Sequence, residues 1–303
     1  MLQFLSRRIS FIAFVCLLIL FFTHFGMSMV RNSELSEPNF DVVEIGQAAW
    51  QGTRTFIEQA VNGELGTVRV DYGTVSINEI LWQAYRNSMG LLLIALVVAS
   101  VAGLVTGIIA AVTKNRKLVL PLLSLTLIGI SVPAFFAALL LQVSEIYYYR
   151  TFGRRLVLLA GYGWDFKHLL LPVLVLAARP LAYITRAAYL SLDRIMEEDF
   201  IRTAFSKGLT LTRTVNVHGL RNIVIPILTA IGVSLRFSLG ILPIVEIFFQ
   251  WPGMGYYLLG AINARQTRLV VVLALALGLT FLVANLLLDL TYRLVDPRLR
   301  EAE

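Results

Sequence analysis

The sequence predicts an all-α membrane protein with about six transmembrane helices. Hydrophobic residues make up 57% of the chain and charged residues only 15%, whereas soluble domains carry about 25% charged residues. Apolar runs of about 20 residues, the length that a helix needs to cross the hydrocarbon core, recur along the chain. The lone Cys16 and three widely spaced histidines predict neither a disulfide nor a metal site, and we expect no cofactor.

The first apolar run covers residues 9–30 and follows Arg7 and Arg8. It has the position of a signal peptide, but it is too long and lacks a small-x-small cleavage site, so we predict a retained transmembrane helix. Residues 1–8 are expected in the cytoplasm. Residues 31–86 are polar and rich in turn-forming pairs, which predicts an external insert containing short helices.

Five further spans are predicted within residues 87–293. Several contain prolines, which membrane helices tolerate when neighbouring groups satisfy the freed carbonyls. Gly103 and Gly107 form a Gly-xxx-Gly face, which predicts close packing within this chain or against another subunit. Residues 294–303 are predicted to form a cytoplasmic tail. The five spans cover residues 90–112, 118–143, 168–189, 223–247 and 269–288.

The distribution of charge orients these helices. With both termini in the cytoplasm and Arg186 counted on the inner side, the inner segments hold 14 Lys and Arg against 7 Asp and Glu, and the outer segments hold 10 of each. The four charges left in or at the edge of spans sum to zero: Arg179, Arg236, Glu246 and Asp289. The net charge of +7 therefore lies on the inner side, as the positive-inside rule requires. The basic balance is then a topology signal rather than a nucleic-acid surface. One outer loop departs from the bias, because it carries Arg150, Arg154, Arg155 and Lys167.

Motifs for catalysis are missing from the sequence. It contains no phosphate-binding loop, no His-Glu-x-x-His and no Gly-x-Ser-x-Gly, so we expect no enzyme and no ATPase site of its own. Energy for transport would come from another chain or from an ion gradient. One function to consider is that of a gradient-driven secondary transporter. Such a transporter is expected to have an inverted repeat and carboxylates at mid-membrane. The two halves of the chain show no convincing repeat.

The charged segment 193–222 predicts two short helices joined by a sharp turn. Acidic residues 197–199 favour a helix start, because negative charge suits that end of the helix dipole. Gly208 is placed to take a left-handed C-terminal cap, and Thr210 or Thr212 to cap the second helix. The first helix offers either a docking surface for another protein or an amphipathic face for lipid. Its apolar stripe consists of Phe200, Ile201, Ala204 and Phe205.

This segment resembles the cytoplasmic EAA loop of ABC transporter permeases, and most closely the dipeptide/oligopeptide/nickel branch of binding-protein-dependent systems. That branch reads approximately (F/Y)-x-R-T-A-x-x-K-G-L and then H-x-L-R-N-x-x-x-P. Its other motifs recur in order at residues 4–8, 251–255 and 285–298, so the resemblance covers nearly the whole chain. The positions that match the loop are Phe200, Arg202, Thr203, Ala204, Lys207, Gly208 and Leu209, followed by His218, Leu220, Arg221, Asn222 and Pro226.

The resemblance implies a permease subunit of an ABC importer in the cell (inner) membrane, which forms the translocation pore for peptides or a similar small solute. It implies a heterodimer with a second homologous permease, cytoplasmic ATP-binding subunits, and an extracellular or periplasmic solute-binding protein. Residues from Phe200 to Leu209 would couple closure of the ATPases to the pore. Members of the family move peptides, nickel, glutathione-like compounds or sugars, so the solute stays open.

Two arginines, Arg179 and Arg236, fall well inside predicted spans. A charged side chain at mid-membrane costs about 2.5–3.5 kcal/mol on insertion scales, so it rarely faces lipid. Glu246 is too far along the same helix to pair with Arg236. Two interpretations stay open for these arginines: they pair with groups on other helices, or they line the translocation path and attract an anionic group such as a peptide carboxylate.

Overall fold

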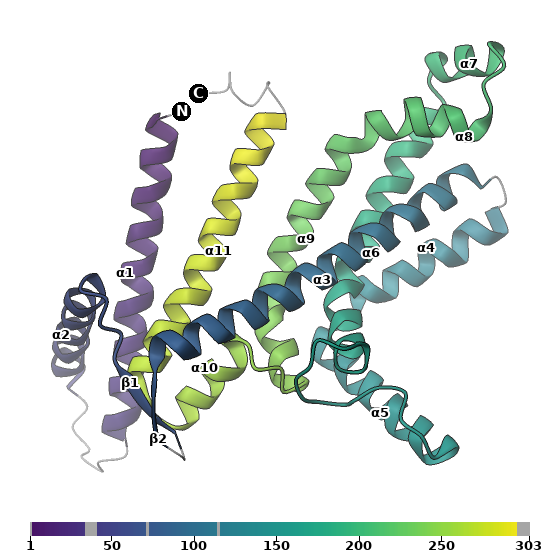
Figure 1. Ribbon diagram of the computed structural model, residues 1–303. Helices are drawn as coiled ribbons and strands as arrows, with labels where there is room; N and C mark the ends of the chain where they lie inside the picture. Colours follow the sequence, from purple (N-terminus) through teal and green to yellow (C-terminus); the bar gives the residue numbers. More distant parts are fainter. Residues whose placement is uncertain (1, 34–40, 71–72, 114–115, 296–303) are drawn as a thin grey trace. The chain divides into compact units, whose positions relative to one another are not determined.

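The computed structural model describes residues 2–33, 41–70, 73–113 and 116–295. These residues are almost entirely helical (Figure 1). Most of the predicted tail 294–303 and part of the predicted insert lie outside them. The elements are α1 Leu2–Ser33, α2 Val42–Val61, β1 Thr67–Val70, β2 Gly73–Ser76, α3 Ile77–Val112, α4 Arg116–Ser131, α5 Ala134–Phe152, α6 Phe166–Met196, α7 Asp199–Ser206, α8 Leu211–Thr214, the π-helix η1 Val215–Gly219, α9 Leu220–Phe248, α10 Met254–Asn263 and α11 Thr267–Val295.

Within the described residues, five helices are long and apolar enough to cross a bilayer. Helices α4 and α5 form a bent pair that raises the number to six if the pair is one span. The prediction of an all-α membrane protein with about six spans is therefore confirmed. The five long segments are Leu5–Val30, Ile77–Val112, Phe166–Met196, Leu211–Phe248 and Thr267–Arg293.

The chain divides into two compact units, Met1–Ser88 with Pro252–Leu287 and Met89–Trp251 with Leu288–Glu303. In the first unit, α2 packs along α1, where the His24 ring lies edge-on to Phe56 with centroids 6.4 Å apart. A two-stranded antiparallel hairpin, β1–β2, follows α2. The predicted short helices of the insert are thus one 20-residue helix, and α3 begins at Ile77, before the predicted end of the insert.

The first unit also fixes the turn that precedes α10. Asn87 Nδ2 donates to the Pro252 carbonyl over 2.9 Å, and the Met254 N–H donates to Ser88 Oγ over 2.8 Å. At the start of α11, Arg268 Nη2 donates to the Glu64 carbonyl and to Gln59 Oε1. These bonds join segments that are far apart in sequence, and they satisfy polar groups that would be costly to bury unpaired.

The second unit is built around the contact between α6 and α9. Asp165 caps the start of α6 by accepting the Lys167 N–H over 3.1 Å. The His168 ring lies 2.5 Å from the same carboxylate, and this hydrogen bond lowers the pKa of Asp165 below its ordinary value. The Asp165 carboxylate is therefore ionised at neutral pH and can accept hydrogen bonds through both oxygens. Its negative charge suits the positive end of the helix dipole.

Helix α3 approaches α6 closely at the Gly-xxx-Gly face. A Cβ at Gly107 would lie 2.5 Å from Ala188 Cβ and 2.6 Å from the Thr185 carbonyl oxygen, and a Cβ at Gly103 would lie 2.9 Å from the Leu181 carbonyl oxygen. Of the two predicted uses for this face, the structure shows packing within the chain.

Gly107→Ala is expected to lower the melting temperature of the purified protein, because backbone atoms of α6 cannot yield to the new methyl and overpacking costs about 1–3 kcal/mol. The matched control is Gly240→Ala in α9, where no heavy atom outside the adjoining helix backbone lies within 4 Å of the position that a Cβ would take. There Ala should be neutral or slightly stabilising. Equal melting temperatures for both variants would contradict the close approach of α3 and α6.

The predicted single span 118–143 is two helices, α4 and α5, whose axes are bent by 110° at Val132 and Pro133. Pro133 has no N–H to continue the helical ladder, and it disfavours the helical conformation of the residue before it. Pro121, by contrast, lies inside α4 without ending it. The break leaves the last carbonyls of α4 without intrahelical donors.

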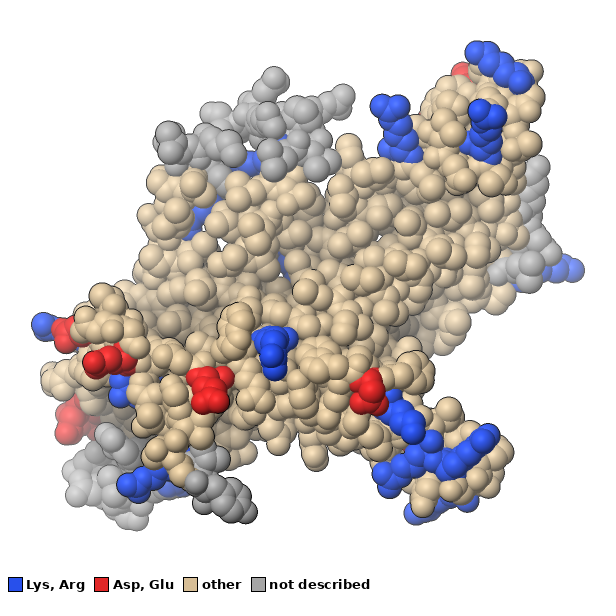
Figure 2. Space-filling model, in the orientation of Figure 1, with Lys and Arg blue, Asp and Glu red and all other residues tan. Residues whose placement is uncertain are grey.

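The far end of α5 carries the basic loop that departs from the charge bias. Lys and Arg side chains gather over this end of the second unit (Figure 2). Buried Glu145 accepts the backbone N–H groups of Leu156 and Val157 over 2.9 and 3.3 Å, which folds the loop back against α5. Arg155 stacks over the Tyr149 ring at 5.3 Å.

Candidate functional site

The short helix α7, residues Asp199–Ser206, forms as the sequence predicts. Asp199 lies in its first turn, and a Schellman motif closes it: Gly208 N donates to the Phe205 carbonyl over 2.9 Å and Leu209 N to the Ala204 carbonyl over 3.2 Å. Gly208 has φ +80°, the left-handed conformation that favours glycine. The next helix begins after Thr210, whose backbone takes the N-cap position while its hydroxyl makes no capping bond.

The two faces of α7 differ in exposure. Ile201 and Ala204 are buried, at 0% and 5% exposed, whereas Phe200 and Phe205 are 44% and 41% exposed. The small side chain of Ala204 therefore packs within the chain and is not part of the exposed face. Two exposed phenylalanines on an eight-residue helix are typical of a surface that another molecule covers. Of the other predicted coupling residues, Arg202, Thr203, Lys207 and Gly208 are exposed and Leu209 is half-buried.

A hydrophobic cluster holds the two chain segments that flank α7. Ala188 and Leu192 of α6 pack with Val215 of η1 and with Ile223 and Ile227 of α9. Segments α8, η1 and α9 follow one another as one long helical span, Leu211–Phe248. Helix α7 therefore connects two membrane helices, α6 and α9, whose ends pack together. The π-helix η1, of a type frequent at functional sites, lies just before α9.

Arg236 of α9 pairs with Asp289 of α11. Its Nη2 lies 3.0 Å from Asp289 Oδ1, and the two side chains are 37% and 21% exposed. Of the two interpretations of this arginine, the structure shows pairing with another helix. The sequence did not identify Asp289 as the partner, because the two residues are 53 positions apart.

Arg179 of α6 has different neighbours. Its Nη2 donates to the Ile130 carbonyl in the last turn of α4 over 3.0 Å, and its guanidinium lies over the Phe237 ring at 5.3 Å. Tyr183 stacks parallel to the same ring, with centroids 5.7 Å apart. Across the described ranges, no carboxylate lies within salt-bridge distance of Arg179. Among the described residues, the polar and ring contacts of this arginine are thus one neutral carbonyl and one aromatic face.

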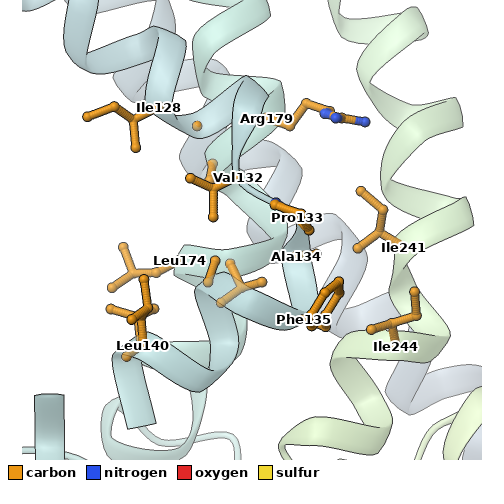
Figure 3. A pocket seen from close by; sticks show the side chains of 15 residues that line it. Ile128, Val132, Pro133, Ala134, Phe135, Leu140, Leu174, Arg179, Ile241 and Ile244 are labelled. Carbon is orange, nitrogen blue, oxygen red and sulfur yellow. The ribbon is translucent and has the colours of Figure 1, made fainter. Parts of the chain in front are cut away.

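A pocket of about 450 Å³ lies beside Arg179, at the break between α4 and α5 (Figure 3). Its walls come from α4, α5, α6 and α9 and are apolar. Val132, Pro133 and Phe135 line it at the break, and Ile241 and Ile244 line it from α9. Arg179 is the charged residue of the lining. A cavity of this size is within the range that small ligands occupy in proteins.

Comparison with known proteins identifies the family. A family model described as "Binding-protein-dependent transport system inner membrane component" matches residues 103–301. The chain belongs to this family. The permease is 33% identical to the dipeptide transport system permease protein DppB of Bacillus subtilis (strain 168) over 226 residues, which cover 74% of this chain and 71% of the relative.

Two further relatives carry related names. The permease is 34% identical to the glutathione transport system permease protein GsiC of Escherichia coli (strain K12), over 81% of this chain and 78% of the relative. It is 35% identical to a putative peptide permease protein of Brucella suis biovar 1 (strain 1330), over 83% and 78%. The resemblance found in the sequence is confirmed: the protein is a multi-pass membrane permease of a binding-protein-dependent ABC importer. This identity leaves the gradient-driven alternative without support.

Proposed function

We propose that this permease forms half of the pathway for peptides or a closely similar small solute, as a heterodimer with a second homologous permease. Partner ATPase subunits would hydrolyse ATP and dock on α7, and a solute-binding protein would deliver the solute from the opposite side. The observation that carries the docking role is the outer face of α7. This face exposes Phe200 and Phe205, and the helix ends at Gly208 in the left-handed conformation. The segments of α6, η1 and α9 that flank α7 are held together by a hydrophobic cluster.

The substrate class rests on the relatives. The three relatives described above are named for dipeptide, glutathione and peptide transport, and each of these compounds contains amide bonds and a free carboxylate. The pocket beside Arg179, apolar with one cation, is compatible with such a solute.

The test is reconstitution of the complete importer. The tagged permease would be co-expressed with its ATPase, second permease and binding protein, purified, and placed in liposomes with a radiolabelled dipeptide outside. We expect uptake that requires ATP and that stops when the ATPase is omitted. Uptake driven by a proton or sodium gradient without ATP would contradict the proposal.

The proposed orientation places both termini and α7 in the cytoplasm and residues 31–86 outside. It rests on the basic bias of the inner segments. In a Cys16→Ser background, Glu64→Cys and Lys117→Cys introduce single thiols at exposed positions of the insert and of the start of α4. A membrane-impermeant maleimide added to whole cells should label Glu64→Cys and not Lys117→Cys. The reverse pattern would invert the orientation.

A further inference from the structure

We propose that the pocket at the break between α4 and α5 binds the C-terminal carboxylate of a peptide together with the apolar side chain next to it, and that Arg179 is the anion partner. The inference rests on the proposed peptide-transport function and adds a specific subsite to it. In this role Arg179 and the apolar walls would select solutes that carry both groups.

The first observation is the contrast between the two membrane arginines. Arg236 is neutralised by Asp289 at 3.0 Å. Arg179 meets a carbonyl and an aromatic face, and no carboxylate approaches it among residues 2–33, 41–70, 73–113 and 116–295. An ionisable residue kept within a span without a counter-ion points to a function there, because its insertion is costly.

The second observation is the donor capacity that remains. A guanidinium has five N–H donors in a planar fork, and the Ile130 carbonyl takes one bond from Arg179 Nη2. This bond and the stacking on Phe237 hold the group in place, so a carboxylate would meet a pre-oriented fork of the kind that binds it bidentately. Figure 3 shows the guanidinium at one end of the pocket, directed towards α9.

The third observation is the apolar lining next to this fork. Phe135, Leu174 and Ile241 line a volume of about 450 Å³, enough for a large apolar side chain and part of a peptide backbone. A ligand complementary to this lining has an anionic end and an apolar body. A dipeptide with a C-terminal aromatic residue has both.

Depth favours a solute over a lipid. Arg179 lies thirteen residues after Phe166, the first residue of α6, which is about 20 Å along the helix axis. The hydrocarbon core is about 30 Å thick, so a helix that enters the core near Phe166 carries Arg179 about two thirds of the way across it. Phospholipid headgroups lie at the bilayer surfaces, out of reach of this position. A small solute inside a translocation path meets no such restriction.

The experiment measures binding to the purified importer complex without its solute-binding protein, by scintillation proximity. The probes are radiolabelled alanyl-phenylalanine and its C-terminal amide, which differ in the carboxylate alone. We expect the acid to bind about 10- to 100-fold more tightly than the amide, the ratio that hydrogen bonds between charged groups provide. Arg179→Gln should bring the two affinities together, and Arg179→Lys should keep part of the preference. Both replacements retain a donor for the Ile130 carbonyl.

A second pair of variants tests the walls. Ile241→Trp places bulk in the pocket and should abolish binding of both probes, whereas Leu125→Trp, at a 65% exposed position of α4 outside the lining, should not. Equal affinities of acid and amide in the unmodified complex, or a preference that survives Arg179→Gln, would overturn the inference. Binding of radiolabelled oleate with no binding of either peptide would make the pocket a fatty-acid site. Failure of the proposed function itself would appear separately, as loss of ATP-dependent uptake of every peptide by the complete importer.

Discussion

Gly208→Val is expected to abolish ATP-dependent transport while the permease remains folded and inserted. Gly208 has φ +80°, a conformation that β-branched residues strongly disfavour. Beyond the adjoining residues, no heavy atom lies within 4 Å of a Cβ built there, so the effect comes from the backbone and not from a clash. The bonds from Gly208 N and Leu209 N that close α7 would be strained or lost, and Phe205 would leave the position from which we propose that it contacts the ATPase.

The cost of a left-handed non-glycine residue is about 1–2 kcal/mol. This is too little to prevent insertion of five or six membrane helices, yet enough to displace an eight-residue helix that is packed on one face. We expect uptake in the reconstituted importer to fall by at least about tenfold, a factor that corresponds to 1.4 kcal/mol, and the ATPase to be lost from pull-downs.

The insert provides a matched control in Gly63, which follows α2. Gly63 has φ +77° with open space where a Cβ would lie, and its Schellman bonds are the same: Gly63 N to the Ala60 carbonyl and Glu64 N to the Gln59 carbonyl, each 3.0 Å. Gly63→Val should therefore carry equal backbone strain and leave ATPase binding intact. Loss of ATPase binding in both variants, or in neither, would remove the docking role from α7.

Asp289→Asn is expected to deplete the permease from membranes, and the double variant Arg236→Gln/Asp289→Asn to restore it. Asp289→Asn removes the carboxylate that pairs with Arg236, and Arg236→Gln removes the guanidinium that pairs with Asp289. Removing one member of a buried ion pair costs about 3–5 kcal/mol, and we expect the low end because the Arg236 side chain is 37% exposed. The double variant has no charge to compensate.

The measurements are the amount of permease in isolated membranes and the melting temperature of the purified protein. They are made for Asp289→Asn, for Arg236→Gln and for the double variant. The control is the exposed pair Arg54–Glu58 on α2, whose side chains are 76% and 61% exposed; breaking it should change neither quantity, because such pairs contribute about 0.3–0.5 kcal/mol. A double variant as depleted as the singles would show that the pair is not the stabilising contact.

The spans were predictable because lipid imposes a strong compositional rule on any crossing helix. The sequence could not tell which proline breaks a helix, since all are read alike. Pro121, Pro172 and Pro226 lie inside helices, whereas Pro133 separates α4 from α5 by 110°. At the break, the Ile130 carbonyl accepts a hydrogen bond from Arg179 on α6, and the sequence could not show this contact because the residues are 49 positions apart.

The sequence predicted the local structure of the candidate site but not its tertiary contacts. The acidic start, apolar residues and Gly208 cap of α7 are local signals, and the helix they predict is present. The division of its apolar residues, with Ile201 buried and Phe200 exposed, depends on what α6 and α9 place beneath it. Periodicity shows that a stripe exists and cannot show which part of it the chain itself covers. The pairing of Arg236 with Asp289 and the stacking of Arg179 on Phe237 are likewise tertiary contacts.

The positions of the two arginine partners along the chain set an order for biogenesis. Ile130 precedes Arg179, so when Arg179 leaves the ribosome its acceptor has already been synthesised. Asp289 follows Arg236 by 53 residues, and at about 5–20 residues per second its synthesis lags by about 3–10 s. During that interval the nascent α9 holds an uncompensated cation. We therefore expect the stable insertion of α9 to depend on the synthesis of α11, and an insertase or chaperone to hold α9 until then.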